Sequence, residues 1–447
     1  MSDDTKKTFE NFFNELKAGL KNTYENSKKY MEFLQSTAHF RRYSFNNMLY
    51  LYRQCNMKGC EGKYLNTFKG WRNLGFSVNK GEKAMEILIP SFEKYFRNEE
   101  GTWVALREAT GNEKKKINSG ELRIKEAVKY FFFKKALFDI SQTNCPKEEY
   151  EKTMKENLIP KSLKESQDKK VDFLFLCLKD HLIQNEKANV VFEEMVEGEK
   201  GYTNAEGKIA LNKNNSNLQN LKTIIHEYTH YKLHFKNDIQ LKRYQAEIEA
   251  ESVAYLVCRN FDIDTSDYSF KYINLYGSSN TDEELYKSYE NINNAATDIN
   301  KVLEEALREK MISELVPGDI VYANLKFSDN GEKARRLILI TGKEDEKFKA
   351  FNITGENKQY VTSVLLQKDD GNNLMKDSTV KMDVKYLVDK KDIISRIGHI
   401  KDDDLTRIFK HQKVFEKEGL IKDFTSVTNS AINHEMKNQN ELNLGRI

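Results

Sequence analysis

Several residue types that mark particular classes of protein are scarce in this 447-residue chain. Its five cysteines are odd in number and scattered, which argues against a disulfide framework and favours a reducing compartment. Cys55 and Cys60 are close together, but no second pair of cysteines or histidines accompanies them, so we expect no separate zinc knuckle. The chain has no run of eighteen apolar residues and no apolar segment at its N-terminus. We therefore expect a cytoplasmic protein without a membrane partner.

Charge of one sign is also lacking overall, because 72 basic residues face 69 acidic ones. The net charge of +3 does not by itself imply a nucleic-acid partner. The distribution is more informative, since residues 33–98 contain 11 Lys or Arg, 4 Glu and no Asp. This part of the chain is locally basic. The total length predicts two or three domains.

The chemical motif around which the sequence is organised is His226-Glu227-Tyr228-Thr229-His230. Ser216 and Gln219 predict the start of a helix that continues through this motif. Residues four apart share one face of a helix, so His226 and His230 can both bind one metal ion while Glu227 lies beside it. The alternative is that two histidines on one face are merely hydrogen-bonded core or surface groups.

A third ligand is predicted on the following helical segment, residues 244–258. Glu247 and Glu251 fall on its apolar stripe, whereas Glu249 points away from it. Buried carboxylates are costly unless a cation or hydrogen-bond donors satisfy them. We therefore predict Glu247 as the third ligand of a Zn²⁺ ion and Glu251 as an acceptor that orients a ligand histidine. His234 is interpreted as a surface residue or a residue behind the ligands.

This arrangement predicts a zinc peptidase in which Glu227 is the general base that removes a proton from the attacking water. Two short strands, joined by a turn at residues 204–207, precede the motif. We expect residues 208–212 to form an edge strand that could pair with an extended substrate peptide.

Basic and aromatic residues alternate through residues 40–83, as in proteins that bind single-stranded nucleic acid through phosphate contacts and base stacking. The alternative is a small α+β domain whose aromatic residues form the core. The candidate DNA contacts are Arg41, Arg42, Tyr43, Asn46, Trp71, Lys80 and Lys83.

Three blocks of this region resemble the N-terminal single-stranded-DNA-binding domain of ArdC-type antirestriction proteins. They are Tyr43-Ser-x-Asn46, Trp71-x-x-Leu-Gly-x-x-Val-x-Lys-Gly-Glu-Lys83, and residues 138–143. Phe76 departs from the family, which more often has a basic residue there. In this family the domain precedes a zincin, and residues 208–230 are similar to ImmA/IrrE-type metallopeptidases. The whole chain looks like the LtrC-like proteins of conjugative elements, which implies a role in antirestriction.

From residue 316 the pattern changes to short strands at 316–325, 336–341, 349–354 and 361–366, which predict a small β-barrel. Residues 314–415 resemble the PemK/MazF endoribonuclease fold. The resemblance implies that Arg336 and Thr354 are catalytic and that RNA is a possible partner. The residues after them, Leu337 and Gly355, depart from the family pattern, and we therefore favour a binding module over an active nuclease.

We thus predict a multidomain α+β protein with an ArdC-like domain (8–148), a linker (149–170), a mainly helical zincin-like domain (171–308), a PemK/MazF-like barrel (311–425) and a tail (426–447). Its expected function is single-stranded DNA binding combined with zinc-dependent peptide hydrolysis, in antirestriction or protection of incoming DNA. The alternatives are a non-catalytic DNA-binding protein with structural zinc and an endoribonuclease fused to these domains.

Overall fold

The fold comes from a computed structural model. It describes residues 14, 16–17, 19–40, 43–98, 100–148, 159–164, 166–235, 243–263, 270, 273–326, 333–355 and 361–423. The predicted tail lies outside these residues. Among the described helices, none is long and apolar enough to cross a membrane.

The chain divides into two compact units that each combine distant segments. The first contains residues 1–145, 203–206 and 225–297, and the second contains residues 146–202, 207–224 and 298–447. The units therefore divide the chain differently from the three predicted domains. Helices and sheets occur in both, so the mixed character expected from the sequence is confirmed.

The N-terminal part of the first unit combines short helices with a sheet of order β1-β4-β2-β3. Asn26 begins α2 by accepting a hydrogen bond from the backbone of Lys29, and Gly59 ends α3 in the left-handed conformation. The elements are η1 (Asn22–Glu25), α2 (Ser27–Ala38), α3 (Phe45–Lys58), β1 (Leu65–Asn66), α4 (Phe68–Asn73), β2 (Met85–Arg97), β3 (Trp103–Ala105), η2 (Leu106–Glu108), α5 (Gly111–Asn118), β4 (Ile124–Asp139) and η3 (Ile140–Gln142).

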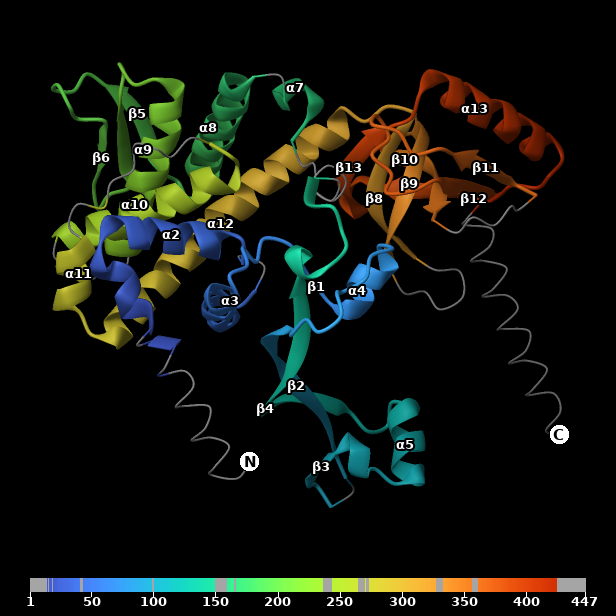
Figure 1. The fold of residues 1–447 in the computed structure, drawn as a ribbon, viewed down its shortest axis with the longest axis horizontal. Coiled ribbons are helices and arrows are strands. Elements are labelled where there is room, and N and C mark those ends of the chain that lie inside the picture. The colour runs from blue at the N-terminus through green and yellow to red at the C-terminus, as the bar shows by residue number, and fades with distance from the viewer. Residues whose placement is uncertain are drawn as a thin grey trace. The chain divides into compact units, whose positions relative to one another are not determined.

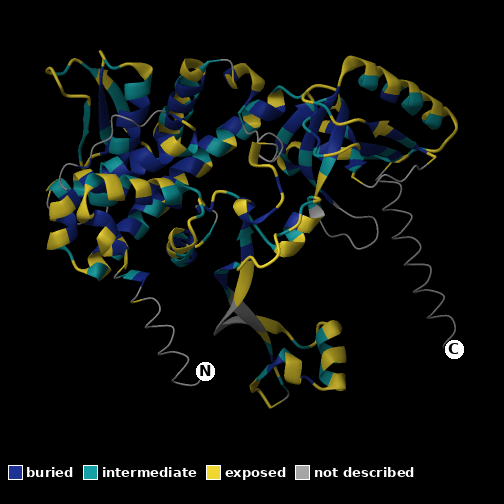
Figure 2. Cartoon of the chain, viewed as in Figure 1, coloured by how far each residue is buried: buried dark blue, intermediate teal, exposed yellow. Residues whose placement is uncertain are grey.

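Strands β2 and β4 form a long antiparallel ribbon whose register shifts between Pro90 and Ser91. A shift there is expected, because proline has no N–H to donate to the ladder. The far end of β2 pairs with β3. Helix α5, which follows, has no buried residue and is largely exposed in Figure 2.

The remainder of the first unit is helical and shares a core with the N-terminal helices. Helix α2 lies beside α10 (Figure 1), and the Tyr30 hydroxyl is 2.8 Å from Ser252 Oγ. The ring of Phe33 lies 4.6 Å from that of Tyr289 on α12. The elements are α9 (Asn217–Thr229), which begins in the second unit, a π-helical segment (His230–Phe235), α10 (Arg243–Asn260), α11 (Ile273–Ser279) and α12 (Asp282–Ser313), which ends in the second unit.

The predicted edge strand is a central strand. Helices α7 (Lys161–Lys164) and α8 (Gln167–Gln184) precede a sheet of order β5-β7-β6, made of β5 (Asn189–Glu193), β6 (Gly201–Thr203) and β7 (Lys208–Asn212). Because β7 has a neighbour on each side, its backbone groups are already paired. The prediction that residues 208–212 bind a substrate peptide as an edge strand is wrong.

The C-terminal part of the second unit is a seven-stranded sheet of main order β11-β12-β10-β9-β8-β13, in which β14 also pairs with β12. The four predicted strands are confirmed as β8 to β11, but no pairing among the described strands closes a barrel. The core includes Phe351 and Ile408. The elements are β8 (Asp319–Lys326), β9 (Lys333–Glu344), β10 (Lys347–Thr354), β11 (Ser363–Leu366), β12 (Ser378–Asp389), η5 (Lys390–Asp392), β13 (Ile393–His399), α13 (Asp402–Lys417) and β14 (Lys422–Asp423).

Candidate functional site

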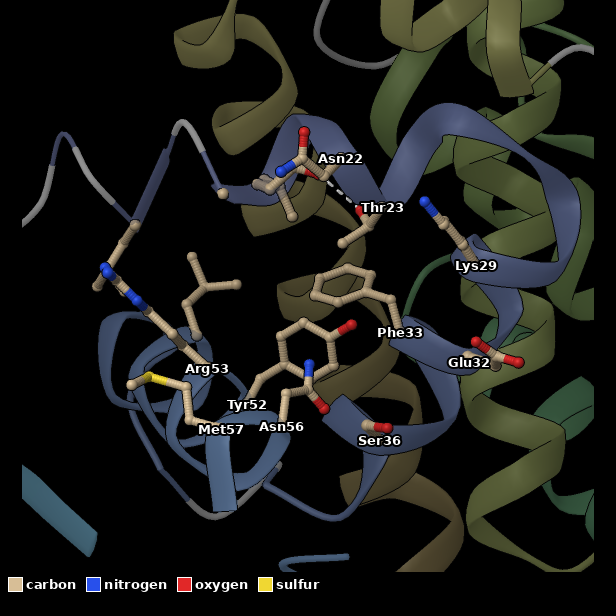
Figure 3. Close-up of a pocket in the computed structure, with 14 residues that line it drawn as sticks. Asn22, Thr23, Lys29, Glu32, Phe33, Ser36, Tyr52, Arg53, Asn56 and Met57 are labelled. Atoms are coloured by element: carbon tan, nitrogen blue, oxygen red, sulfur yellow. Dashed lines mark hydrogen bonds between the residues drawn. The ribbon is translucent and has the colours of Figure 1, made fainter. Parts of the chain in front are cut away.

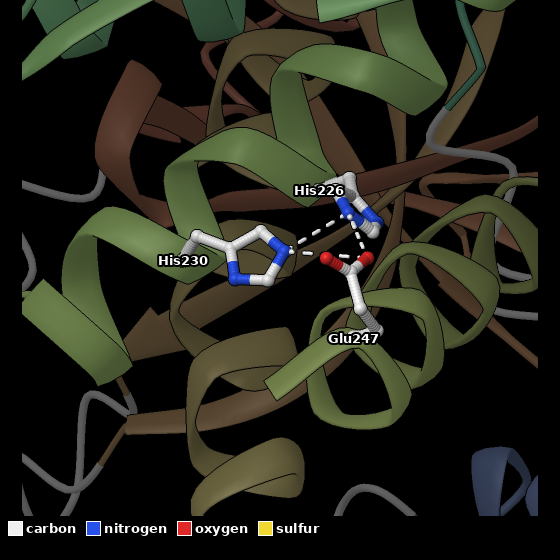
Figure 4. A group of neighbouring side chains, drawn as sticks. All are labelled: His226, His230 and Glu247. Atoms are coloured by element: carbon white, nitrogen blue, oxygen red, sulfur yellow. Dashed lines mark hydrogen bonds and ion pairs between the residues drawn. The ribbon is translucent and has the colours of Figure 1, made fainter. Parts of the chain in front are cut away.

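The structure brings the three predicted zinc ligands together within the first unit, as Figure 4 shows. The start of the helix is as expected, because Ser216 Oγ accepts a hydrogen bond from the backbone N–H of Gln219. Helix α9 carries His226, the π-helical segment begins with His230, and α10 supplies Glu247.

The ligand atoms have the spacing of one metal site. The two Nε2 atoms of His226 and His230 are 3.0 Å apart, and Glu247 Oε2 lies 3.3 Å from the first and 3.7 Å from the second. Zinc bonds of about 2.0–2.2 Å in a tetrahedron place ligand atoms about 3.3–3.6 Å apart. The three donors therefore fit a zinc ion without rearrangement of the helices.

The other ring nitrogen of each histidine also has a partner. Glu251 Oε2 lies 3.2 Å from His226 Nδ1, the position predicted for an orienting carboxylate. His230 Nδ1 lies 3.0 Å from His234 Nδ1. These contacts direct both Nε2 atoms toward Glu247. His234 lies behind His230 with a side chain only 8% exposed, so it is not a surface residue.

Glu249 requires a correction, because it does not face solvent. Its side chain is 4% exposed and its Oε2 atom lies 3.2 Å from His234 Nε2. The hydroxyls of Ser288 and Tyr276 donate to its other oxygen at 2.6 and 3.4 Å. Glu249, His234 and His230 therefore form a continuous hydrogen-bonded chain that leads to the metal site.

The electrostatics of the cluster favour a bound cation. Burial alone lowers the pKa of His226, but hydrogen bonds to Glu247 and Glu251 raise this pKa to about 10. Hydrogen bonds from His226 and His230 hold the pKa of Glu247 well below its usual range. Glu227 is 8% exposed, and its charge also raises the pKa of His226. The predicted general base thus lies near the ligands.

The predicted DNA contacts lie in different environments. Lys80 and Lys83 are exposed, while Tyr43 and Asn46 are half-buried. Asn46 accepts a hydrogen bond of 2.6 Å from the Tyr286 hydroxyl. Arg41 and Arg42 lie outside the described residues.

Trp71 is a core residue and cannot stack on a base. It is fully buried, and its indole N–H donates to the carbonyl of Phe138 at 2.9 Å. Two exposed aromatic side chains were missed, Phe68 at 56% and Trp103 at 49% exposure. Phe68 lies at the start of α4, three residues before Trp71, a spacing that places two residues on the same face of a helix, so helical periodicity gave no signal for its exposure.

A cavity of about 780 Å³ lies between η1, α2 and α3 (Figure 3). Its wall combines the aromatic side chains of Phe33 and Tyr52 with the charged groups of Lys29, Glu32 and Arg53. None of the residues that line it belongs to the histidine cluster, so the cavity is a separate feature of the ArdC-like region.

Arg336 and Thr354 lie at the same end of neighbouring strands in the second unit. Strands β9 and β10 are antiparallel, with Leu337 opposite Ile353, and this register places Arg336 opposite Thr354. Arg336 is exposed and Thr354 is half-buried. The arrangement is compatible with the PemK/MazF resemblance, which stays a prediction.

Comparison with known families identifies two kinds of domain in this chain. Residues 3–131 match the N-terminal domain of anti-restriction factor ArdC, and residues 168–258 match the IrrE N-terminal-like domain. The second match contains all three candidate ligands. An uncharacterized protein of Bacillus anthracis, pXO2-81, is 28% identical over 302 residues, which are 64% of this chain and 50% of that protein. The chain thus spans about half the length of this relative.

Two solved structures of antirestriction protein ArdC from the R388 plasmid are also similar. The metal-free structure has 18% identity and a TM-score of 0.33, covering 59% of this chain and 84% of its own. The Mn(II)-bound structure has 17% identity and the same TM-score, covering 58% and 83%.

Proposed function

We propose that this protein binds single-stranded DNA and hydrolyses peptide bonds with a zinc ion held by His226, His230 and Glu247. Both activities would contribute to antirestriction. The observation that carries the proposal is the convergence of these three donors within the segment that matches the IrrE-like domain. The match of residues 3–131 to the ArdC domain supports the antirestriction role.

Zinc in this site would supply a Lewis acid that polarises a peptide carbonyl and acidifies water. The protein side chains perform the other tasks. Glu227 accepts the proton of the attacking water, since it is a buried carboxylate next to His226. Glu251 and His234 hold the two imidazole rings in the orientation that directs Nε2 inward. Glu247 is the most exposed ligand, with 48% of its side chain accessible, and this marks the open side through which a peptide could enter.

The rival proposal is a DNA-binding protein in which zinc only stabilises the fold. A structural zinc site usually closes with a fourth protein ligand and needs no general base. Among the described residues, only His226, His230 and Glu247 form a group of three His, Cys, Asp or Glu donors close enough together to hold one metal ion. The three-ligand set beside Glu227 therefore favours the catalytic proposal.

Metal content tests the ligand assignment. Purified wild-type protein should contain about one zinc per chain, and His226→Ala, His230→Ala and Glu247→Ala should lose it. Glu194→Ala, an exposed carboxylate in another segment, serves as a control and should retain it. Equal zinc in Glu247→Ala and wild type would place the third ligand elsewhere.

For DNA, we propose phosphate contacts by exposed lysines, including Lys80 and Lys83, and stacking by exposed aromatic rings. The full chain should prefer single strands to duplex, and its affinity should fall with salt by a log-log slope of about −0.7 per phosphate neutralised. Equal affinity for single-stranded and duplex DNA would contradict the proposal that the protein prefers single strands. It would not affect the proposal of a zinc site.

For the C-terminal sheet, we propose a binding module rather than a nuclease, with RNA as a possible ligand. Thr354 is followed by Gly355 and Arg336 by Leu337, which departs from the PemK/MazF pattern on both strands. RNA incubated with the full chain should remain intact. Cleavage that disappears in Arg336→Ala would establish the nuclease instead.

A further inference from the structure

Three sulfur atoms converge in the N-terminal part of the first unit. Cys55 lies in the last turn of α3, Cys60 lies just beyond it, and Met85 begins β2. The Met85 thioether sulfur is 3.3 Å from Cys55 Sγ and 3.7 Å from Cys60 Sγ. Cys55 and Met85 are buried, whereas Cys60 is partly exposed and gives the cluster an edge toward solvent.

The backbone at the end of α3 brings the two cysteines together. Gly59 adopts the left-handed conformation, and the Cys60 N–H donates to the Cys55 carbonyl at 3.1 Å, so the chain turns back over the helix end. Gly62 packs against Phe40 and Cys55, because a Cβ at this position would lie 2.5 Å from the Phe40 ring and 2.7 Å from Cys55 Sγ. Gly59 thus supplies the left-handed turn, and Gly62 allows the close approach of the loop to Cys55.

A buried carboxylate whose charge acts on Cys55 has one oxygen atom without a partner among the described residues. Asp139 is 2% exposed, and its Oδ1 atom accepts hydrogen bonds from the backbone and hydroxyl of Ser141. Its Oδ2 atom is buried with no hydrogen-bond partner in the described part of the chain.

Asp139 also acts on the thiols. Contact with Cys60, burial and the negative charge of Asp139 together raise the pKa of Cys55. Contact with Cys55 lowers the pKa of Cys60. The charge of Asp139 therefore reaches the cluster at Cys55.

We propose that Cys55, Cys60 and Met85 form a binding site for one Cu(I) ion, independent of the zinc site. Thiolate and thioether ligands select soft ions, and thioether sulfur is characteristic of Cu(I) rather than Zn²⁺ sites. Metal–sulfur bonds of about 2.3 Å place the sulfurs of one site about 3.8–4.0 Å apart, so a small opening of the cluster admits the ion. Binding forms two Cu–thiolate bonds and one Cu–thioether bond, and it releases the two thiol protons to solvent without any change of oxidation state.

Weak S–H···S contacts alone give little reason for this convergence, because thiols are poor donors and thioethers are poor acceptors. Cysteine and methionine in an ordinary core pack against apolar neighbours. Here, two of the five cysteines of the chain meet a methionine from another element, with all three sulfur atoms in one cluster. This combination carries the assignment of a metal site.

The test is a competition for Cu(I) between the reduced full-length protein and bicinchoninate under anaerobic conditions. Wild type should withhold one more equivalent of Cu(I) than the Cys55→Ser/Cys60→Ser double variant. Met85→Leu, which nearly conserves volume, should fold normally and weaken Cu(I) binding at least tenfold. Cys177→Ser removes a cysteine from the second unit and should behave as wild type.

Zinc content is measured on the same samples, so a failure at the copper site is distinguished from a failure at the histidine site. Zinc should be unchanged in Cys60→Ser and Met85→Leu. Equal retention of Cu(I) by wild type, the double variant and Met85→Leu would overturn the proposal. A Cys55–Cys60 disulfide in a protein that withholds no Cu(I) even after reduction would equally overturn it and make the pair a redox couple.

Discussion

At the scale of single residues, the candidate zinc site depends on the nitrogen atoms that do not face the metal. With His230 Nε2 directed at the metal position, its Nδ1 is left to carry the proton and donate to His234. His234 can then donate from Nε2 to Glu249. Partners of this kind fix the orientation of a ligand ring, and removing them weakens metal binding.

His234→Gln should therefore lower zinc affinity about 10–100-fold while the protein remains folded, as measured by competition with a zinc chelator. The glutamine cannot reproduce both contacts of the imidazole. His181→Gln is a matched control, because His181 is a histidine of α8 that contacts Asn185 and lies in the second unit. Unchanged affinity in His234→Gln would show that His230 is oriented without it.

Glu249→Ala should lower the melting temperature, although the sequence places Glu249 away from the helix face that carries Glu247. The substitution leaves His234 and the Ser288 hydroxyl without their buried acceptor, which costs about 1–3 kcal/mol for each unsatisfied group. Thermal unfolding of the metal-free protein measures the effect apart from zinc loss. Glu290→Ala, a less buried glutamate on α12, should change the melting temperature far less.

Alanine substitutions of Trp71 and Phe68 should distinguish an aromatic ring that stabilises the core from one that binds DNA. Trp71→Ala removes a fully buried ring and should reduce the free energy of unfolding by about 3–5 kcal/mol. Phe68→Ala should leave stability nearly unchanged but weaken single-stranded DNA binding by about 1–3 kcal/mol if the exposed ring stacks on a base. Denaturant titration and a DNA-binding assay on both variants decide the matter, and a Phe68→Ala variant with wild-type affinity would contradict stacking.

These residues also show where prediction from sequence ends. Helical spacing alone predicts His226, His230 and Glu247 as ligands, because the three residues lie on two helical segments whose periodicity can be read from the sequence. It cannot show that the opposite side of α10 is also buried, since the partners of Glu249 are Tyr276 and Ser288 from two later helices. The convergence of Met85 with Cys55 likewise depends on how β2 meets α3.

At the scale of helices and strands, the main finding is that α2 packs against α10. Tyr30 and Ser252 are 222 positions apart in sequence, and nothing in either amphipathic pattern indicates which helix is its partner. The status of β7 was unpredictable for a similar reason. Alternation identifies a strand, but only the order of the whole sheet tells whether that strand lies at an edge.

A fragment that starts at residue 149 and ends at residue 308 should not fold into a stable zinc-binding domain. Helix α10 would lose its contacts with α2, and Tyr289 would lose its contact with Phe33. The loss of these contacts would expose apolar side chains that are buried in the full chain. We therefore expect the fragment to lack fixed tertiary packing and to unfold without a cooperative transition. Circular dichroism and zinc titration of the fragment, with the full chain as control, test this. A cooperative transition with wild-type zinc affinity would contradict the shared core.

At the scale of the whole molecule, the two regions that match known families are not separate folding units. The ArdC match ends at residue 131 and the IrrE-like match begins at residue 168, yet helices from both regions contribute to the first unit. The region proposed to bind DNA therefore shares a core with the helices that hold the candidate ligands. Sequence motifs indicate where along the chain both proposed functions would lie, but they do not reveal this common core.

The most direct test of the central proposal is peptide hydrolysis by Glu227→Gln, with a mixed peptide library analysed by mass spectrometry in the presence and absence of single-stranded DNA. The substitution removes the general base but none of the three ligands. We predict zinc-dependent cleavage by wild type, and no cleavage by a Glu227→Gln protein that retains full zinc content. Cleavage by Glu227→Gln at the wild-type rate, or none by zinc-loaded wild type under either condition, would contradict the assignment of a metallopeptidase.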